Sequence, residues 1–254
     1  MPSAALDVYV KAFLARVAAA ESAGDAIITE PGIHGLLPCG SEQRIRLLVT
    51  DDRALDRLSS LVGNARAGMV SVCAGAVRCR ELLDDDPAWQ ASSATAMICR
   101  CLQAVPAAAL PAGLTVRPVQ RLAEDPPGGV SLEQAVATAG RADPHTTDPR
   151  ALAGHLQSLP RAFRLWAAVD GDGVVRATSA SAAFGATASV IFVNTDPGWR
   201  RRGIARAMAA LALRAAEQAG ARHAGLDASE AGRELYLRLG FVAVMPIWRY
   251  RPSA

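Results

Sequence analysis

Residues 193–205 read VNTDPGWRRRGIA, and this stretch decides how the whole chain is interpreted. An apolar run ends before Pro197, a turn rich in arginine follows, and a long apolar segment begins at Ile204. The pattern predicts a strand over 189–195 and a helix over 204–219. N–H groups at a helix start lack intrahelical partners and carry the positive end of the helix dipole. A turn of this kind therefore favours a bound anion.

The residue types within the turn sharpen this prediction. Gly203 lets the main chain approach an anion closely, and the small Ala205 removes bulk two residues later. The expected ligand of this turn is a pyrophosphate group. A Walker loop is excluded because the only lysine is Lys11, and the turn lacks the three glycines of a dinucleotide fingerprint. Charge-assisted donors are supplied by Arg200, Arg201, Arg202 and Arg206.

A second signature follows one predicted helix and one predicted strand later. Tyr236 is followed closely by Leu239-Gly240-Phe241, where Gly240 closes a helix predicted over 230–239. Two short strands are predicted after it, over 241–244 and 247–251. The first signature has the form Arg-x-x-Gly-x-Ala. With both signatures on these elements at this interval, the chain resembles the GNAT superfamily of acyl-CoA N-acyltransferases. The resemblance covers residues 114–251 and is sharpest over 190–241.

The resemblance implies an activity and a donor. Acetyl-CoA would be the acyl donor, and no metal is implied. Tyr236 looks like the general acid that protonates the departing CoA thiolate, and main-chain groups of Val193 and Thr195 would bind the pantetheine arm. Ser229 stands where many members of the family have asparagine. The residues predicted to bind acetyl-CoA are Val193, Thr195, Arg200, Arg201, Arg202, Gly203, Ile204, Ala205, Arg206 and Ser229.

One member of the usual catalytic set is missing. Many members of the family carry a glutamate on the fourth strand that takes the amine proton through water. Only Ser189, Asn194 and Asp196 lie near that place in the sequence, and Asp196 is close to the loop. No general base is predicted. Whether Trp199 packs on the adenine or covers the turn also stays open.

The predicted fold class is mixed α/β in two domains. Residues 114–254 are expected to form the catalytic domain, a mostly antiparallel, twisted mixed sheet flanked by helices, after a linker over 106–113. Residues 1–105 repeat the order of three strands, helix, strand, helix, strand, like a truncated GNAT half. Their turn, 50–53 (TDDR), has two acids and no glycine, and acids repel pyrophosphate. This half is expected to be non-catalytic, packing against the second half and walling the acceptor cleft.

Composition bounds the remaining alternatives. Apolar residues make up 51% and charged residues 20%, and no signal or membrane-spanning segment is evident, which predicts a cytoplasmic globular protein. Aromatic residues are only 5%, which argues against nucleic acid as a partner. The five cysteines lack the spacing of a zinc site. The predicted acceptor is a primary amine of a small molecule. The alternatives are a protein or peptide acceptor and a CoA-binding regulatory module without turnover. The oligomeric state is left open, with a homodimer as one option.

Overall fold

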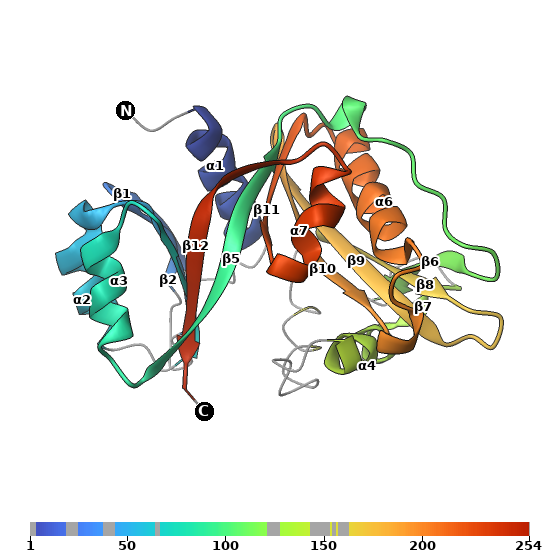
Figure 1. The fold of residues 1–254 in the computed structure, drawn as a ribbon, viewed down its shortest axis with the longest axis horizontal. Coiled ribbons are helices and arrows are strands. Elements are labelled where there is room, and N and C mark those ends of the chain that lie inside the picture. The colour runs from blue at the N-terminus through green and yellow to red at the C-terminus, as the bar shows by residue number, and fades with distance from the viewer. Residues whose placement is uncertain are drawn as a thin grey trace. The chain divides into compact units, whose positions relative to one another are not determined.

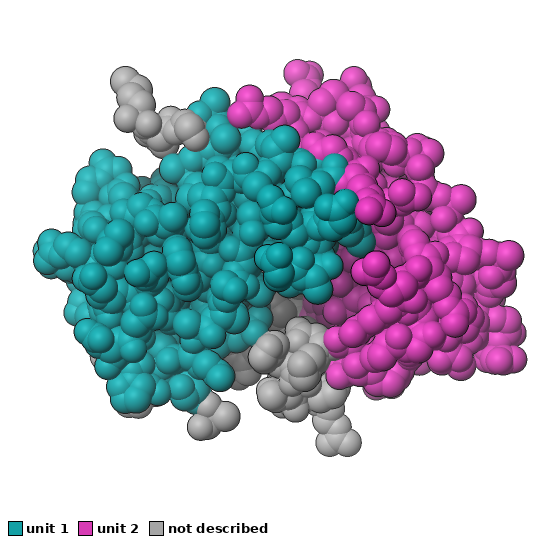
Figure 2. All heavy atoms as spheres, viewed as in Figure 1, with its two compact units in different colours: residues 1–98, 225–237, 241–254 teal, residues 99–224, 238–240 magenta. Residues whose placement is uncertain are grey.

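The computed structural model describes residues 4–18, 25–37, 44–63, 67–120, 128–142, 153, 156 and 163–253. These residues fall into two compact units, each described by itself (Figure 2). Unit 1 comprises residues 1–98, 225–237 and 241–254, and unit 2 comprises residues 99–224 and 238–240. The sequence also predicts a helical stretch over 150–159, and this segment lies outside the described residues apart from Ala153 and Leu156.

Unit 1 contains most of the N-terminal half and the C-terminal end of the chain. Figure 1 labels most of its helices and strands. Its elements are α1 (Ala4–Ala18), β1 (Ala26–Glu30), β2 (Ile33–Leu37), β3 (Arg44–Val49), the 3-10 helix η1 (Asp52–Ala54), α2 (Leu55–Val62), β4 (Ala67–Cys73), α3 (Val77–Asp84), β5 (Trp89–Cys99), β11 (His223–Ala228), α7 (Glu230–Leu237) and β12 (Val242–Pro252).

In the sheet of unit 1, the last strand of the chain, β12, lies between two strands of the N-terminal half, β4 and β5. The strand order is β1-β2-β3-β4-β12-β5-β11, with β3 and β4 parallel and β12 antiparallel to both of its neighbours. The expectation of two short strands over 241–244 and 247–251 was wrong. A single strand runs over residues 242–252, with a register shift between Ala243 and Met245. It stays continuous past Pro246 because it pairs with β5 throughout, whereas pairing with β4 begins only at Ile247.

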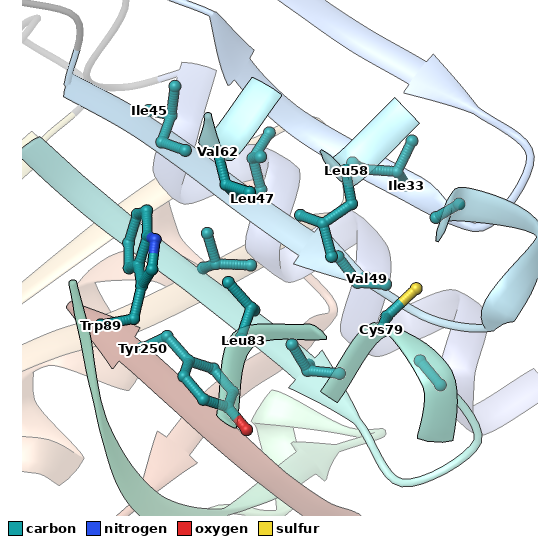
Figure 3. Packing of buried hydrophobic residues seen from close by; sticks show 14 residues of the cluster. Ile33, Ile45, Leu47, Val49, Leu58, Val62, Cys79, Leu83, Trp89 and Tyr250 are labelled. Atoms are coloured by element: carbon teal, nitrogen blue, oxygen red, sulfur yellow. The ribbon is translucent and has the colours of Figure 1, made fainter. Parts of the chain in front are cut away.

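Helices cover both faces of this sheet. On one face, Tyr9, Phe13 and Val17 of α1 pack on strand residues that include Leu48 and Ile247. On the other face, α2 and α3 contribute Leu58, Val62, Cys79 and Leu83 to a second core, which Figure 3 shows together with Trp89 and Tyr250. Because both faces bury apolar side chains, the strands of unit 1 are held in register by their packing.

Unit 2 contains the segment that carries the first signature. Its strand order is β10-β9-β8-β6-β7. β9 is buried along most of its length, and both α6 and α4 pack against it. The elements are η2 (Leu102–Ala104), β6 (Thr115–Gln120), β7 (Val130–Ser131), α4 (Leu132–Ala142), β8 (Phe163–Val169), β9 (Val175–Phe184), β10 (Thr187–Thr195), the 3-10 helix η3 (Pro197–Trp199) and α6 (Ile204–Gln218).

The predicted fold class and the repeated order of elements are confirmed. β1, β2, β3, α2, β4, α3 and β5 follow one another as β8, β9, β10, α6, β11, α7 and β12 do. The compact units divide the chain differently from the expected boundary at 106–113, because β12 pairs with β4 and β5. The functional roles assigned to residues 1–105 and 114–254 stay predictions. Of the described helices, none is long and apolar enough to cross a membrane.

Candidate functional site

The last residues of β10 form a β-bulge. The register with β9 shifts between Ile191 and Asn194, and Phe192 adopts a left-handed φ of 58°. The carbonyl oxygen of Phe192 accepts a hydrogen bond of 3.0 Å from Thr178 Oγ1. A bulge interrupts the ladder and re-aims the backbone at this point. Val193, one of the predicted pantetheine-binding residues, lies inside it.

Thr195 follows the bulge and pairs with Ala177 of β9. Its side chain is buried, and Oγ1 has no hydrogen-bond partner in the described part of the chain. A buried hydroxyl without a partner loses its hydration without compensation. The predicted contact of Thr195 with the pantetheine arm involves its main-chain groups, and it stays a prediction.

The turn between β10 and α6 leaves a run of main-chain donors free. Arg201 and Gly203 adopt left-handed φ angles of 66° and 79°, and α6 begins at Ile204 without a side-chain cap. The N–H groups of residues 201–206 have no acceptor among the described residues. Consecutive amides in right- and left-handed conformations form a concave seat for anions, here joined to a helix N-terminus. A Cβ at Gly203 would meet nothing within 4 Å, so space is open beside these amides.

The four arginines of the turn differ in their roles. Arg200 donates to main-chain oxygens, those of Ala142 at 2.7 Å and Thr195 at 3.3 Å, so its guanidinium holds the loop in place. Arg202 donates to the oxygen of Gly198 at 3.2 Å. The exposed side chains of Arg201 and Arg206 have no partner in the described residues. Arg201 and Arg206 are therefore the two arginines of the turn that are left to meet an anion.

Trp199 covers the turn from within unit 2. Its ring lies between the guanidinium groups of Arg202, at 4.8 Å, and Arg176, at 5.1 Å. It also packs on the core formed by α6 and the neighbouring strands. These contacts tie Trp199 to the turn, and whether its ring also packs on the adenine stays open. Arg176 was not identified from the sequence, because it lies on β9, more than twenty residues from the turn.

The carboxylate of Asp196 interacts with three nitrogen donors. It accepts from Arg141 Nε at 3.1 Å and from the amide of Gly198 at 3.1 Å, and Arg176 Nη1 lies 3.8 Å away. These contacts occupy both oxygens of the carboxylate within the turn. Asp196 is thus a structural residue of the turn, and the described residues supply no replacement for the missing glutamate at this point.

The second signature positions Tyr236 on α7, in unit 1. The amide of Phe241 donates to the carbonyl oxygen of Tyr236 at 3.0 Å, and the two rings meet edge to face with centroids 5.7 Å apart. Gly240, with φ of 85°, allows the chain to reverse at this helix end. The Leu-Gly-Phe sequence therefore fixes the backbone and the ring of Tyr236.

Ser229 and Tyr236 share one side of α7. A Cβ at Gly232 would lie 3.3 Å from Ser229 Oγ and 3.5 Å from Cε2 of Tyr236, so this glycine keeps the space between them open. The hydroxyl groups of Ser229 and Tyr236 have no partner among the described residues. Burial raises the pKa of the Tyr236 phenol, which keeps it protonated and able to donate. Ser229 and Tyr236 belong to unit 1, whereas residues 193–206 belong to unit 2.

Comparison with known proteins identifies the segment that carries both signatures. The model of the acetyltransferase (GNAT) family matches residues 132–241. The match covers less than half of the chain, and it supports acyl transfer by the matched segment. Sequence comparison with curated proteins gives no match. Members of the GNAT family generally use acetyl-CoA as the donor.

Solved structures extend the similarity in fold to the whole chain. A GCN5-related N-acetyltransferase from Kribbella flavida is 20% identical, with a TM-score of 0.66 over 97% of this chain and 96% of its own. A putative GNAT acetyltransferase from Novosphingobium aromaticivorans is 17% identical, with a TM-score of 0.56 over 98% and 99%. A tandem GNAT protein from the clavulanic acid biosynthesis pathway is 15% identical, with a TM-score of 0.52 over 87% and 79%. At these identities the similarity shows the fold, which is that of a tandem GNAT layout.

Proposed function

We propose that this chain transfers the acetyl group of acetyl-CoA to a primary amine of a small molecule, by direct transfer in a ternary complex. The observation that carries the proposal is the run of free N–H groups over residues 201–206, together with the unpaired guanidinium groups of Arg201 and Arg206. Six main-chain donors and two cations suit the pyrophosphate of CoA. The buried, unpaired hydroxyl of Thr195 and the bulge at Val193 suit the pantetheine arm that follows it.

The transfer step requires a nucleophile, an acceptor carbon and a proton donor. The amine lone pair attacks the thioester carbonyl carbon, a C–N bond forms, and the C–S bond breaks. The nitrogen loses one proton, and the departing sulfur gains one. Tyr236 is proposed as the donor to sulfur, because its hydroxyl has no partner and its pKa is raised by burial. No carboxylate is proposed as base, since the ion pairs of Asp196 remove the one candidate near the bulge.

The first experiment measures acetyl-CoA binding and turnover with the purified full chain and a panel of primary amines. Acetyl-CoA should bind, and mass spectrometry should detect N-acetylated product from at least one amine. Binding without product from any small amine or peptide would favour the regulatory module. Product from peptides alone would favour the protein acceptor.

The second experiment tests the role of Tyr236. Tyr236→Phe removes only the proposed proton donor, so kcat should fall about 100-fold while the affinity for acetyl-CoA stays unchanged. Because the pKa of Tyr236 is raised, the wild-type kcat should not decline through loss of this proton below about pH 10. The matched control is Tyr250→Phe, which removes a hydroxyl that donates to Asp84 at 2.6 Å on the α3 side of unit 1. The control should lose stability and keep its kcat, and an equal fall in both variants would contradict the assignment.

A further inference from the structure

A cluster of charged groups lies buried beneath α1 in unit 1. Asp227 of β11 accepts hydrogen bonds from Tyr9 Oη at 2.6 Å and from Arg16 Nη1 at 3.2 Å. The side chains of Arg16 and Asp227 are only 13% and 5% exposed. Burial raises the pKa of Tyr9 well above its usual value, with Asp227 adding to the effect, so Tyr9 is a neutral donor. Within this trio, Arg16 balances the charge of Asp227.

Arg249 brings a second cation to the same face of the sheet. Ile247 packs with Tyr9 and Phe13 of α1, and side chains two residues apart on a strand share a face. Burial lowers the pKa of Arg249, Asp227 raises it, and Arg251 and Arg16 lower it further, which shows that these charges act on one another. Arg249 has no acceptor for its guanidinium among the described residues. Asp227 therefore pairs with Arg16 and not with Arg249.

Three donors in this region point to a missing partner. Arg16 Nη2, Arg249 Nε and Ser71 Oγ are buried, and none has a partner in the described part of the chain. Ser71 is fully buried and lies directly opposite Arg249 in the pairing of β4 with β12. Buried polar groups are nearly always hydrogen-bonded, and a buried cation without an anion is strongly destabilised. The set Tyr9, Arg16, Ser71, Asp227 and Arg249 is called the arginine cluster below.

The strand between Arg249 and Asp227 carries only small side chains on this face. β5 separates β12 from β11, so the two outer strands are about 10 Å apart. Ser92 and Ala94 of β5 lie opposite Arg249 and Ile247, and Ala96 follows on the same face. One carboxylate and two guanidinium groups leave one net positive charge, which suits a monoanion such as a carboxylate.

We propose that the arginine cluster binds the carboxylate of the amine acceptor, so that the acceptor is an amino acid or a related aminocarboxylate. This inference rests on the proposed acetyl transfer for the identity of the ligand, and on the unpaired donors for its charge. β11 runs from Asp227 directly to Ser229 at the start of α7, the helix that carries Tyr236. Two residues of strand span about 7 Å, a distance that a small aminocarboxylate can bridge.

The test compares amines that differ only in their anionic group. Glycine, β-alanine and 4-aminobutyrate are assayed against their carboxamides, so that both the charge and its distance from the nitrogen are varied. At least one carboxylate should be acetylated with a kcat/KM about 10- to 100-fold above that of its carboxamide, since charge-assisted hydrogen bonds have this strength. Equal values for every pair would overturn the proposal while leaving acetyl transfer intact.

The matched variants are Arg249→Gln and Arg78→Gln, the latter an exposed arginine of α3 in the same unit. Arg249→Gln should abolish the preference by raising KM for the carboxylate. Arg78→Gln should keep the preference. A preference that persists in Arg249→Gln would overturn the proposal. Ser71→Ala, which removes one hydroxyl and no charge, should raise the same KM about threefold to tenfold, so the proposal stays testable if Arg249→Gln fails to fold.

A binding measurement without acetyl-CoA separates this proposal from the proposed function. The aminocarboxylates should raise the melting temperature of the wild type and not that of Arg249→Gln, whether or not any amine is acetylated. Loss of turnover with retained binding would remove the transferase proposal and keep the anion site. Propionate, which carries the carboxylate without an amine, should inhibit competitively with the acceptor. Inhibition that is non-competitive with the amine would overturn the assignment of the cluster to the acceptor.

Discussion

The two halves of the chain each lead a strand into a helix at the same point of the repeated order, yet the two turns satisfy their main chain in opposite ways. After β3, the carboxylate of Asp51 accepts from the amide of Arg53 at 3.1 Å, and the carbonyl of Asp51 accepts from Ala54 at 3.3 Å. The carboxylate of Asp52 accepts from the amide of Cys79. After β10, the six amides of residues 201–206 have no acceptor in the part of the chain that the structure describes. The first turn is therefore closed by its own acids, and the second is open to an external anion.

The strands before the two turns differ in the same sense. β3 pairs with β4 up to Val49, the last residue of β3, which lies opposite Val72. β3 also pairs with β2 without a register shift, whereas β10 bulges at Phe192. Strands that stay paired to the end leave no main-chain groups for a pantetheine arm between them. The comparison supports the prediction that the first half binds no CoA.

The largest effect is expected from closing the open turn. Gly203→Val puts a β-branched residue at a φ of 79° and a side chain beside the free amides. The affinity for acetyl-CoA should fall more than 100-fold, because the amides of the helix start can no longer reach the pyrophosphate. Titration calorimetry measures the loss, and circular dichroism checks the fold.

Gly173→Val is the matched control for Gly203→Val. Gly173 lies in the β8–β9 hairpin of the same unit, has a φ of 78°, and has nothing within 4 Å of an added Cβ. Both variants carry the same backbone strain of about 1–2 kcal/mol. Gly173→Val should lose stability and keep its affinity for acetyl-CoA. If both variants bound acetyl-CoA as well as the wild type, the open turn would not be its binding site.

Much of the difference between the two turns could be predicted from the sequence, because it depends on local residue types. The two acids at positions 51 and 52 predicted a turn that repels an anion, and in the structure Asp51 caps η1. Gly203 was predicted to let the main chain approach an anion, and in the structure it is the left-handed N-cap of α6. Neighbouring residues in the chain decide such features, so propensity and spacing carry the information.

Features that depend on partners distant in the chain were not predicted. The insertion of β12 between β4 and β5 joins segments more than 140 residues apart, and its local pattern gave two short strands. The bulge at Phe192 contains no glycine that would indicate it in the sequence. The hydroxyl of Thr178 on β9 stabilises it by donating to the carbonyl oxygen of Phe192. The arginine cluster draws on four elements of unit 1. Periodicity reports which side chains are buried, but it does not report which strands become neighbours.

A smaller effect is expected from the free cations of the open turn. Arg206→Gln removes one unpaired guanidinium at the start of α6, so the affinity for acetyl-CoA should fall about threefold to tenfold. The loss should shrink as ionic strength rises, because the side chain is exposed and its attraction for phosphate is screened. Arg214→Gln, an exposed arginine farther along α6, is the control and should leave the affinity unchanged. Equal losses in both variants would show a non-specific charge effect.

The smallest effect is expected in the closed turn, and it concerns stability alone. Asp51→Ala removes the cap of η1 and should lower the free energy of unfolding by about 1 kcal/mol. Hydrogen bonds from Arg53 lower the pKa of Asp51, so the stabilisation is present above about pH 4, where the unfolded carboxyl is ionised, and is lost as pH falls through the lowered pKa. The difference from wild type, measured by urea unfolding, should therefore shrink in acid. Asp56→Ala, which removes an exposed acid of α2, should lower the free energy of unfolding by only a few tenths of a kcal/mol.

Calorimetry should find one acetyl-CoA per chain, with the same affinity, in the wild type and in both variants. A second equivalent bound by the wild type and lost in Asp51→Ala would break the comparison, because a turn closed by its own carboxylates cannot also bind a pyrophosphate.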